Sequence, residues 1–186
     1  WRLNWEESPV TRWGIAVVGL ACALGARAQD PRLTMEGYGP ARIGMTRDAL
    51  SSALGAPVVV PDIYAGEDPN GCIQVYAGSP GTPRRSSRDD ILYMLVDGRL
   101  ARIDIVQPTV ASLSGIRVGM PEADVLRAYR GRIASSPHFY GEAGDHYLTL
   151  HSQDGRLGMR FETIEGRVTA FRAGTAEAIE YVEGCL

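Results

Sequence analysis

Two segments of this chain repeat one short pattern, and the repeat limits the folds that are open to it. The first segment, IGMTRDALSSALG, begins at Ile43, and the second, VGMPEADVLRAYRG, begins at Val118, 75 positions later. In both, a glycine and a methionine precede a short run with apolar residues at i, i+3 and i+4, which is typical of an amphipathic helix. A helix with one narrow apolar stripe has to cover another element, so each copy is expected to pack against a partner.

Start and stop signals limit both helices. Thr46 is a natural N-cap, because its hydroxyl can accept a hydrogen bond from an orphan backbone N–H. Pro121 fills the same place as a first-turn proline, where its missing N–H is not needed. Gly55 and Gly131 suit the left-handed residue that closes a helix.

The residues after each helix predict strands with turn-like pairs between them. The expected strands are 72–76, 91–96 and 100–106 in the first half, and 146–151, 158–163 and 168–173 in the second. A final stretch, 176–183, reads as a terminal strand or a helix. We favour a strand, because Ile179 and Tyr181 alternate with Glu180 and because a strand would bring Cys185 toward Cys72.

These elements predict an α+β fold. Two tandem helix-plus-antiparallel-meander units, at about 37–107 and 112–185, are expected to form one sheet with the helices packed on one face. Neither half can bury its apolar face alone, so residues 29–186 are expected to fold as a single domain.

Residues 1–28 read as a cleavable signal peptide. An uncharged apolar stretch, 14–25, follows Arg12 and precedes the small residues Ala26-Arg27-Ala28. The stretch is too short to cross a bilayer as a helix, which needs roughly 20 residues. A buried core helix and lipidation of Cys22 are the alternatives, although Gly19 stands where a lipobox has a branched or leucine side chain.

Cysteine usage agrees with export to the periplasm or the medium. Once Cys22 is removed, Cys72 and Cys185 remain as an even pair with one possible connectivity. Such a pair usually closes in an oxidising compartment, so we expect a disulfide. Two free buried thiols are the alternative.

The repeated motif resembles a known superfamily. The residues that carry the resemblance are Gly44-Met45-Thr46 with Gly55 and Gly119-Met120-Pro121 with Gly131, each followed by a meander. They are similar to the SmpA/OmlA small outer-membrane lipoproteins and the related β-lactamase-inhibitor-like fold, where such units occur singly or in tandem. The resemblance implies a non-catalytic protein that binds another envelope protein or envelope component, and it carries over no functional residue.

Composition and motifs argue against several other functions. The chain has a net charge of −3, no lysine and no basic block, which disfavours nucleic acid as a partner. It has no GxSxG, HExxH or P-loop sequence, so we expect neither an enzyme nor a bound cofactor. The alternative function is a small-ligand or metal-binding protein that uses the segment from His138 through His146 to His151. We assign no metal ligands there, because His146 and His151 would point to opposite faces of a strand.

One loop differs between the two halves. The first half has residues 78–90 where the second has a tight turn, and this loop carries Arg84, Arg85 and Arg88. Loops carry recognition more often than scaffolds do. We therefore predict that these arginines contact an anionic partner, either an acidic protein patch or a lipid head group; a mobile surface insertion is the alternative.

Overall fold

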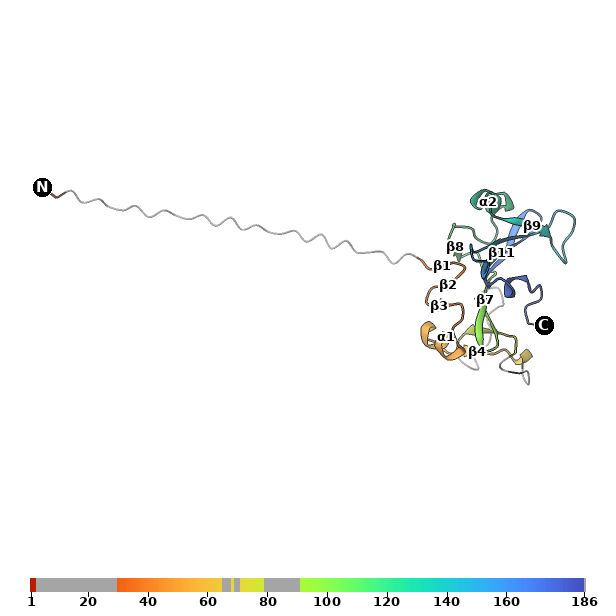
Figure 1. Ribbon diagram of the computed structural model, residues 1–186, viewed down its shortest axis with the longest axis horizontal. Helices are drawn as coiled ribbons and strands as arrows, with labels where there is room; N and C mark the ends of the chain where they lie inside the picture. The colour runs from red at the N-terminus through yellow and green to blue at the C-terminus, as the bar shows by residue number, and fades with distance from the viewer. Residues whose placement is uncertain (3–29, 65–67, 69–70, 79–90, 186) are drawn as a thin grey trace.

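Eight strands form one antiparallel sheet, and this sheet with its helices confirms the α+β class (Figure 1). The computed structural model describes residues 1–2, 30–64, 68, 71–78 and 91–185. In spatial order the strands are β4 (Val58–Val59), β5 (Ile73–Ala77), β6 (Leu92–Val96), β7 (Arg99–Ile105), β12 (Arg167–Thr175), β11 (Leu157–Ile164), β10 (His146–His151) and β9 (Ala134–Pro137). The six longest lie where the sequence predicts them, while β4 and β9 are additional strands at the two edges.

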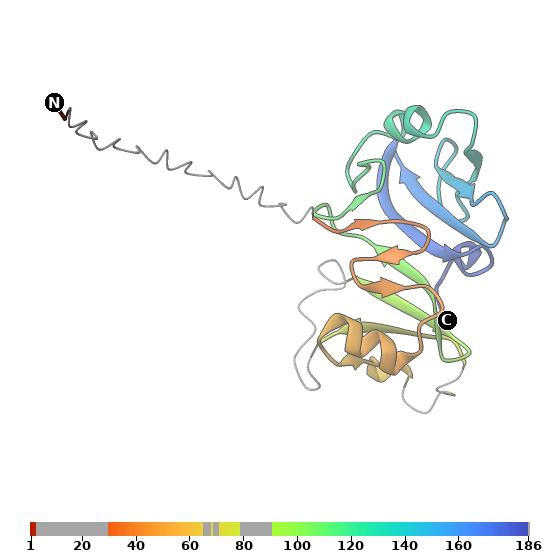
Figure 2. The same cartoon turned by 60° about the vertical axis from the view of Figure 1, so that its left-hand side comes forward.

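Smaller elements surround the sheet. They are the parallel pair β1 (Arg32–Leu33) and β8 (Ala111–Ser112), the pair β2 (Gly37–Tyr38) and β3 (Ala41–Arg42), the helices α1 (Arg47–Leu54) and α2 (Glu122–Ala128), and the 3₁₀ helices η1 (Asp62–Tyr64) and η2 (Ala178–Glu180). Figure 2 shows α1 and α2 at opposite ends of the molecule, with β2 and β3 between them. No helix in the described part of the chain is long and apolar enough to cross a membrane.

The start of each α-helix is attached to the sheet by the same backbone contacts. Gly44 and Gly119 both have a φ of 90°, a conformation that side chains with a Cβ rarely adopt. The N–H of Gly44 donates to the carbonyl of Leu100, and that of Gly119 donates to the carbonyl of Val168, both at 2.7 Å. Leu100 and Val168 return hydrogen bonds to the carbonyls of the following methionines, at 2.8 and 2.9 Å. The glycine of each repeated motif therefore fixes a helix start against a strand.

The helix ends agree with the sequence in α1 and differ in α2. Thr46 caps α1 by accepting from the N–H of Ala49, and Gly55 closes it with a φ of 64°. In α2, Pro121 lies just before the first helical residue instead of within the first turn. The helix already ends at Ala128, so Gly131, although its φ is 74°, is not the residue that closes it.

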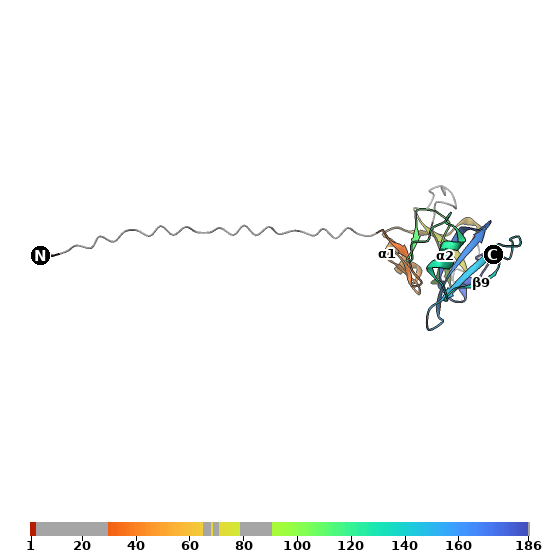
Figure 3. The ribbon, with the colours of Figure 1, turned by 90° about the horizontal axis from the view of Figure 1, so that it is seen from above.

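The two faces of the sheet are covered differently. Leu50 of α1 and Val125 of α2 are fully buried in one apolar core, together with Ile103 of β7 and Phe161 of β11. On the opposite face a smaller cluster contains Met94 and Ala101, and it is covered by Ala178 of η2. Seen from above, β9 and the end of the chain lie on the side away from α1 (Figure 3).

The strand favoured for residues 176–183 is wrong. After β12 the chain turns into η2, where the successive residues Ala178 and Ile179 are both buried, a pattern that a half-exposed strand cannot give. The carbonyls of Ala178 and Tyr181 accept hydrogen bonds from the side chain of Arg102, so they are not free for a strand ladder. Cys185 still reaches Cys72, but by way of this turn.

Candidate functional site

The sheet face opposite the α-helices carries buried charge. Arg102, Arg160 and Arg172 project from three strands and are all at least nine-tenths buried. Charged side chains are almost never so deeply buried without partners. The partners of these three arginines therefore identify the segments that this face of the sheet holds in place.

Arg102 holds the end of the chain on the sheet. Its Nε lies 3.0 Å from both carboxylate oxygens of Asp104, and its Nη1 donates to the carbonyls of Ala178 and Tyr181 at 2.8 Å each. Burial lowers the pKa of Arg102, and the neighbouring Asp104 opposes that shift. The arginine thus links a central strand to the C-terminal segment, by which we mean residues 176–185.

The other two arginines have different surroundings. Arg160 donates to Thr149 at 2.9 Å, pairs with Glu180 of η2, and stacks over the ring of Tyr147 at 4.8 Å. Arg172 pairs with Glu162, and its buried Nε has no hydrogen-bond partner in the described residues. Arg172 therefore retains an unused donor at the centre of this face.

Two further contacts fix the C-terminal segment. Ile179 is fully buried against Gly158 of β11, where an added Cβ would come 2.4 Å from its Cδ1. The structure also joins Cys72 and Cys185 in the disulfide that the sequence predicts. Residues 176–185 are thus attached to the sheet at η2 and again at their end.

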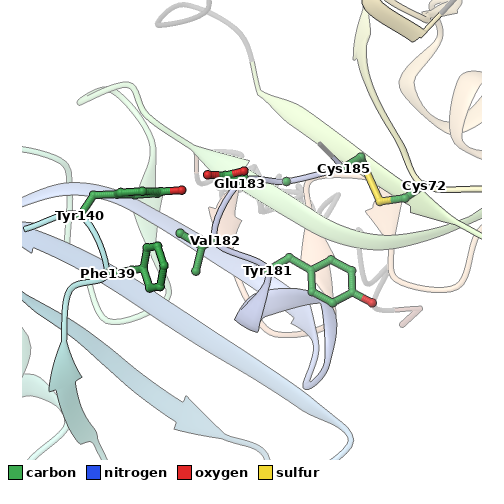
Figure 4. A pocket seen from close by; sticks show the side chains of 8 residues that line it. Cys72, Phe139, Tyr140, Tyr181, Val182, Glu183 and Cys185 are labelled. Carbon is green, nitrogen blue, oxygen red and sulfur yellow. A yellow bond between two sulfur atoms is a disulfide. The ribbon is translucent and has the colours of Figure 1, made fainter.

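A groove of about 600 Å³ runs between this segment and the loop formed by residues 138–145 (Figure 4). Its walls are Cys72, Phe139, Tyr140, Tyr181, Val182, Glu183, Gly184 and Cys185. In Figure 4 the rings of Phe139 and Tyr140 stand on one side of Val182, with Tyr181 and the disulfide on the other. We call this the aromatic groove.

The aromatic side chains of the loop are exposed although the loop itself is well held. Phe139 is 71 % exposed and Tyr140 is 62 % exposed, and their rings meet edge to face at 4.8 Å. The carboxylate of Asp145 accepts the N–H groups of Glu142 and Glu165 at 2.8 Å each. These hydrogen bonds, that of Glu165 first, lower the pKa of Asp145. The loop therefore presents two large apolar rings on a fixed backbone.

A smaller pocket of about 220 Å³ lies beside the aromatic groove and shares Val182, Glu183 and Gly184 with it. Its polar lining residues include Gln74, Arg102, Asp104, Glu162 and Arg172. Its volume is below the range of about 300–1,000 Å³ that is usual for small-molecule sites. The larger aromatic groove is therefore the better candidate for a binding surface.

The three histidines do not meet. His138 stacks on Tyr147 at 4.3 Å, and His146 lies 3.1 Å from Glu122 through its Nδ1, while His151 is exposed at the far end of β10. The described residues include no group of three or more histidine, cysteine or acidic side chains placed to hold a metal ion.

Two sequence predictions lie outside the described residues. Arg84, Arg85 and Arg88 belong to the segment 79–90, and the proposed signal peptide, with Cys22, belongs almost entirely to the segment 3–29. The aromatic groove was not predicted from the sequence. Its one visible signal was a Phe-Tyr pair between Pro137 and Gly141, in a loop without apolar periodicity.

Comparison with known proteins gives two distant structural neighbours. No family model matches the chain, and no curated protein matches it. The uncharacterized protein yfeY from Escherichia coli is 12 % identical with a TM-score of 0.47, and the match covers 77 % of this chain and 99 % of that one. An extracellular protein containing an SCP domain, from Bacillus anthracis, is 11 % identical with a TM-score of 0.43, over 73 % of this chain and 44 % of that one. The present chain thus spans less than half of that second structure.

Proposed function

We propose that this protein is an exported, non-catalytic binding module of the cell envelope, periplasmic or secreted, which holds a segment of a partner protein in its aromatic groove. The observation that carries the proposal is the exposure of Phe139 and Tyr140, 71 % and 62 %, beside a groove of about 600 Å³. Large aromatic side chains dominate the binding energy of protein interfaces when they are central and rigidly held.

The loop that carries these rings is held in place, and this rigidity favours a role in binding. Asp145 ties the loop to β11 and β12 through Glu165, and His138 anchors its start by stacking on Tyr147. A surface that is already ordered loses little conformational entropy when a partner binds. A protein segment fits such a groove better than a metal ion, since no group of three or more potential metal ligands forms among the described residues.

Export is supported by the Cys72–Cys185 disulfide, because such bonds persist in oxidising compartments. The absence of catalysis is supported by the pairing of the buried ions. Arg102 is held by Asp104 and Arg172 by Glu162, so the charged groups at the centre of this face are paired with one another and serve to hold the C-terminal segment.

We also propose that the two halves are tandem copies of one unit, as the resemblance to the SmpA/OmlA and β-lactamase-inhibitor-like proteins implies. The matched contacts of Gly44 and Gly119 support this, as do the matched turns before β7 and β12. In these turns Asp97 and Glu165 have φ values of 51° and 50°, and each is followed by a glycine with positive φ. The strand order also fits two related halves. From the centre of the sheet to its edge, one half runs β7, β6, β5, β4 and the other runs β12, β11, β10, β9.

Affinity capture with matched variants tests the binding function. The purified chain would be immobilised and exposed to an envelope extract, in parallel with the double variant Phe139→Ser/Tyr140→Ser. The control is Leu113→Ser, which removes an equally exposed apolar side chain, 64 % exposed, outside the groove. We expect a protein that the parent and the control retain and the double variant loses, and that binds again as a purified component.

Three results would contradict this function. One is capture that does not depend on Phe139 and Tyr140. The others are groove-dependent binding of lipid vesicles in place of protein, and groove-dependent self-association measured by light scattering. Equal melting temperatures of the variants would show that loss of capture does not come from unfolding.

A further inference from the structure

We infer that the partner segment in the aromatic groove is cationic and bears arginine or lysine side chains. The inference rests on the proposed function and adds the chemistry of the partner to it. It is carried by the distribution of charge around the groove, by one carboxylate in its wall that has no partner among the described residues, and by the aromatic rings that line the same groove.

Basic residues are missing from both walls of the groove. The chain has 19 arginines, yet none lies in residues 133–155 or in residues 173–186. The loop 138–145 and the segment 176–185 instead carry five carboxylates, namely Glu142, Asp145, Glu177, Glu180 and Glu183. Complementary charge steers association and excludes partners of the same sign, so these walls favour a cationic segment.

Three of these carboxylates already have intramolecular partners. Asp145 accepts backbone N–H groups, Glu180 pairs with Arg160, and Glu177 accepts the hydroxyl of Tyr181 at 3.0 Å. The side chains of Glu142 and Glu183 have no hydrogen bond or ion pair within the described part of the chain, and of these two Glu183 lines the groove, where it is exposed to solvent. It is the carboxylate in the groove that remains available to an incoming cation.

The aromatic rings suit the same partner. Glu183 and Tyr140 both line the groove (Figure 4), so a guanidinium or ammonium group bound in it has both an acid and an aromatic ring available. A cation over an aromatic face is attracted by the ring quadrupole. The chain uses this contact within its own fold, where Arg160 lies 4.8 Å from the centre of the Tyr147 ring.

A random peptide library displayed on phage is the probe, since it imposes no charge in advance. The library is selected on the parent chain and depleted on the Phe139→Ser/Tyr140→Ser variant, which leaves peptides that need the groove. We expect these peptides to be enriched in arginine and lysine. The best one is then synthesised and titrated against Glu183→Arg and against Asp48→Arg, which makes the same charge change on the exposed face of α1, away from the groove.

The expected result is binding about tenfold weaker for Glu183→Arg than for Asp48→Arg, together with a decrease as salt is raised. Peptides that need the groove but are neutral or acidic, or that bind both arginine variants equally, would overturn the cationic partner and leave the binding function intact. A selection that yields no groove-dependent peptide would instead contradict the binding function, so the two failures are distinguishable.

Discussion

Asp104 and Arg172 lie directly opposite each other on β7 and β12, the two strands at the centre of the sheet. Oδ1 of Asp104 is 4.0 Å from Nη1 of Arg172, and the same carboxylate binds Nε of Arg102 at 3.0 Å. Counted from Leu100 and Val168, which receive the matched glycine contacts, the two residues occupy equivalent positions of the two halves. The first half thus contributes the aspartate of this pair and the second half contributes the arginine. This pairing links the two halves across the centre of the sheet.

Replacing Arg102 is expected to destabilise the protein strongly. Arg102→Met removes both hydrogen bonds to the C-terminal segment. It also removes the guanidinium group that lies closest to the carboxylate of Asp104. Breaking one side of a buried ion pair usually costs about 3–5 kcal/mol, and we expect a loss in that range in urea unfolding. The control is Arg130→Met, an exposed arginine at the end of α2, with an expected effect within about 0.5 kcal/mol. Equal effects of the two substitutions would show that Arg102 does not hold the segment.

The disulfide is expected to contribute a large share of the stability. It joins residues that are 113 positions apart, and the chain-entropy model assigns such a closure about 4–5 kcal/mol. The double variant Cys72→Ser/Cys185→Ser should therefore unfold at a lower urea concentration than the oxidised parent. Addition of a reductant should lower the midpoint of the parent and leave that of the double variant unchanged. If reduction leaves the midpoint of the parent unchanged, the bond does not stabilise the protein by restricting its unfolded chain.

Two glycine substitutions test the tandem arrangement. Gly44→Ala and Gly119→Ala each force a side chain into a φ of 90°, which should cost about 1–2 kcal/mol at either position. Gly78→Ala is the control, because Gly78 is not among the glycines with positive φ. Similar losses at both motifs in thermal or urea unfolding would fit two copies of one unit. Full tolerance at one of them would count against the equivalence.

The pH dependence of stability should identify the contribution of Asp145. Its backbone hydrogen bonds hold its pKa below the ordinary value of 3.8, so the folded pKa is lower than the unfolded one. The carboxylate therefore contributes stability that is fully present above the unfolded pKa and is lost as the pH falls through the folded pKa. Asp145→Asn should be less stable than the parent near pH 7, and the difference should shrink below about pH 4. A difference that stays constant across this range in urea titrations would contradict the assignment.

The strands of the sheet are local features, which is why the sequence predicts them well. The run His146–His151 is a short segment rich in strand-favouring residues between turn-like segments, and it forms β10 with those bounds. Strand β9 gives no such signal, because all of its residues are exposed and it ends in Pro137.

The candidate site depends on contacts between residues that are distant in sequence. The turn at η2 is held by Arg102, 76 positions from Ala178 and 79 from Tyr181, and no pattern within residues 176–183 reveals these hydrogen bonds. Likewise, the exposure of Phe139 and Tyr140 follows from where the loop 138–145 leaves the sheet. A Phe-Tyr pair in a sequence usually indicates core, and only the packed structure places this pair on the surface.

Photo-crosslinking at the groove tests the central claim most directly. The photoreactive amino acid p-benzoylphenylalanine would replace Tyr140 in one variant and Leu113 in another, and both would be produced in cells that export the chain. We predict that irradiation yields one discrete protein adduct with the probe at position 140 and none with the probe at position 113, where the side chain is equally exposed. No adduct at position 140, or the same adducts from both positions, would contradict the account that this groove binds a partner protein.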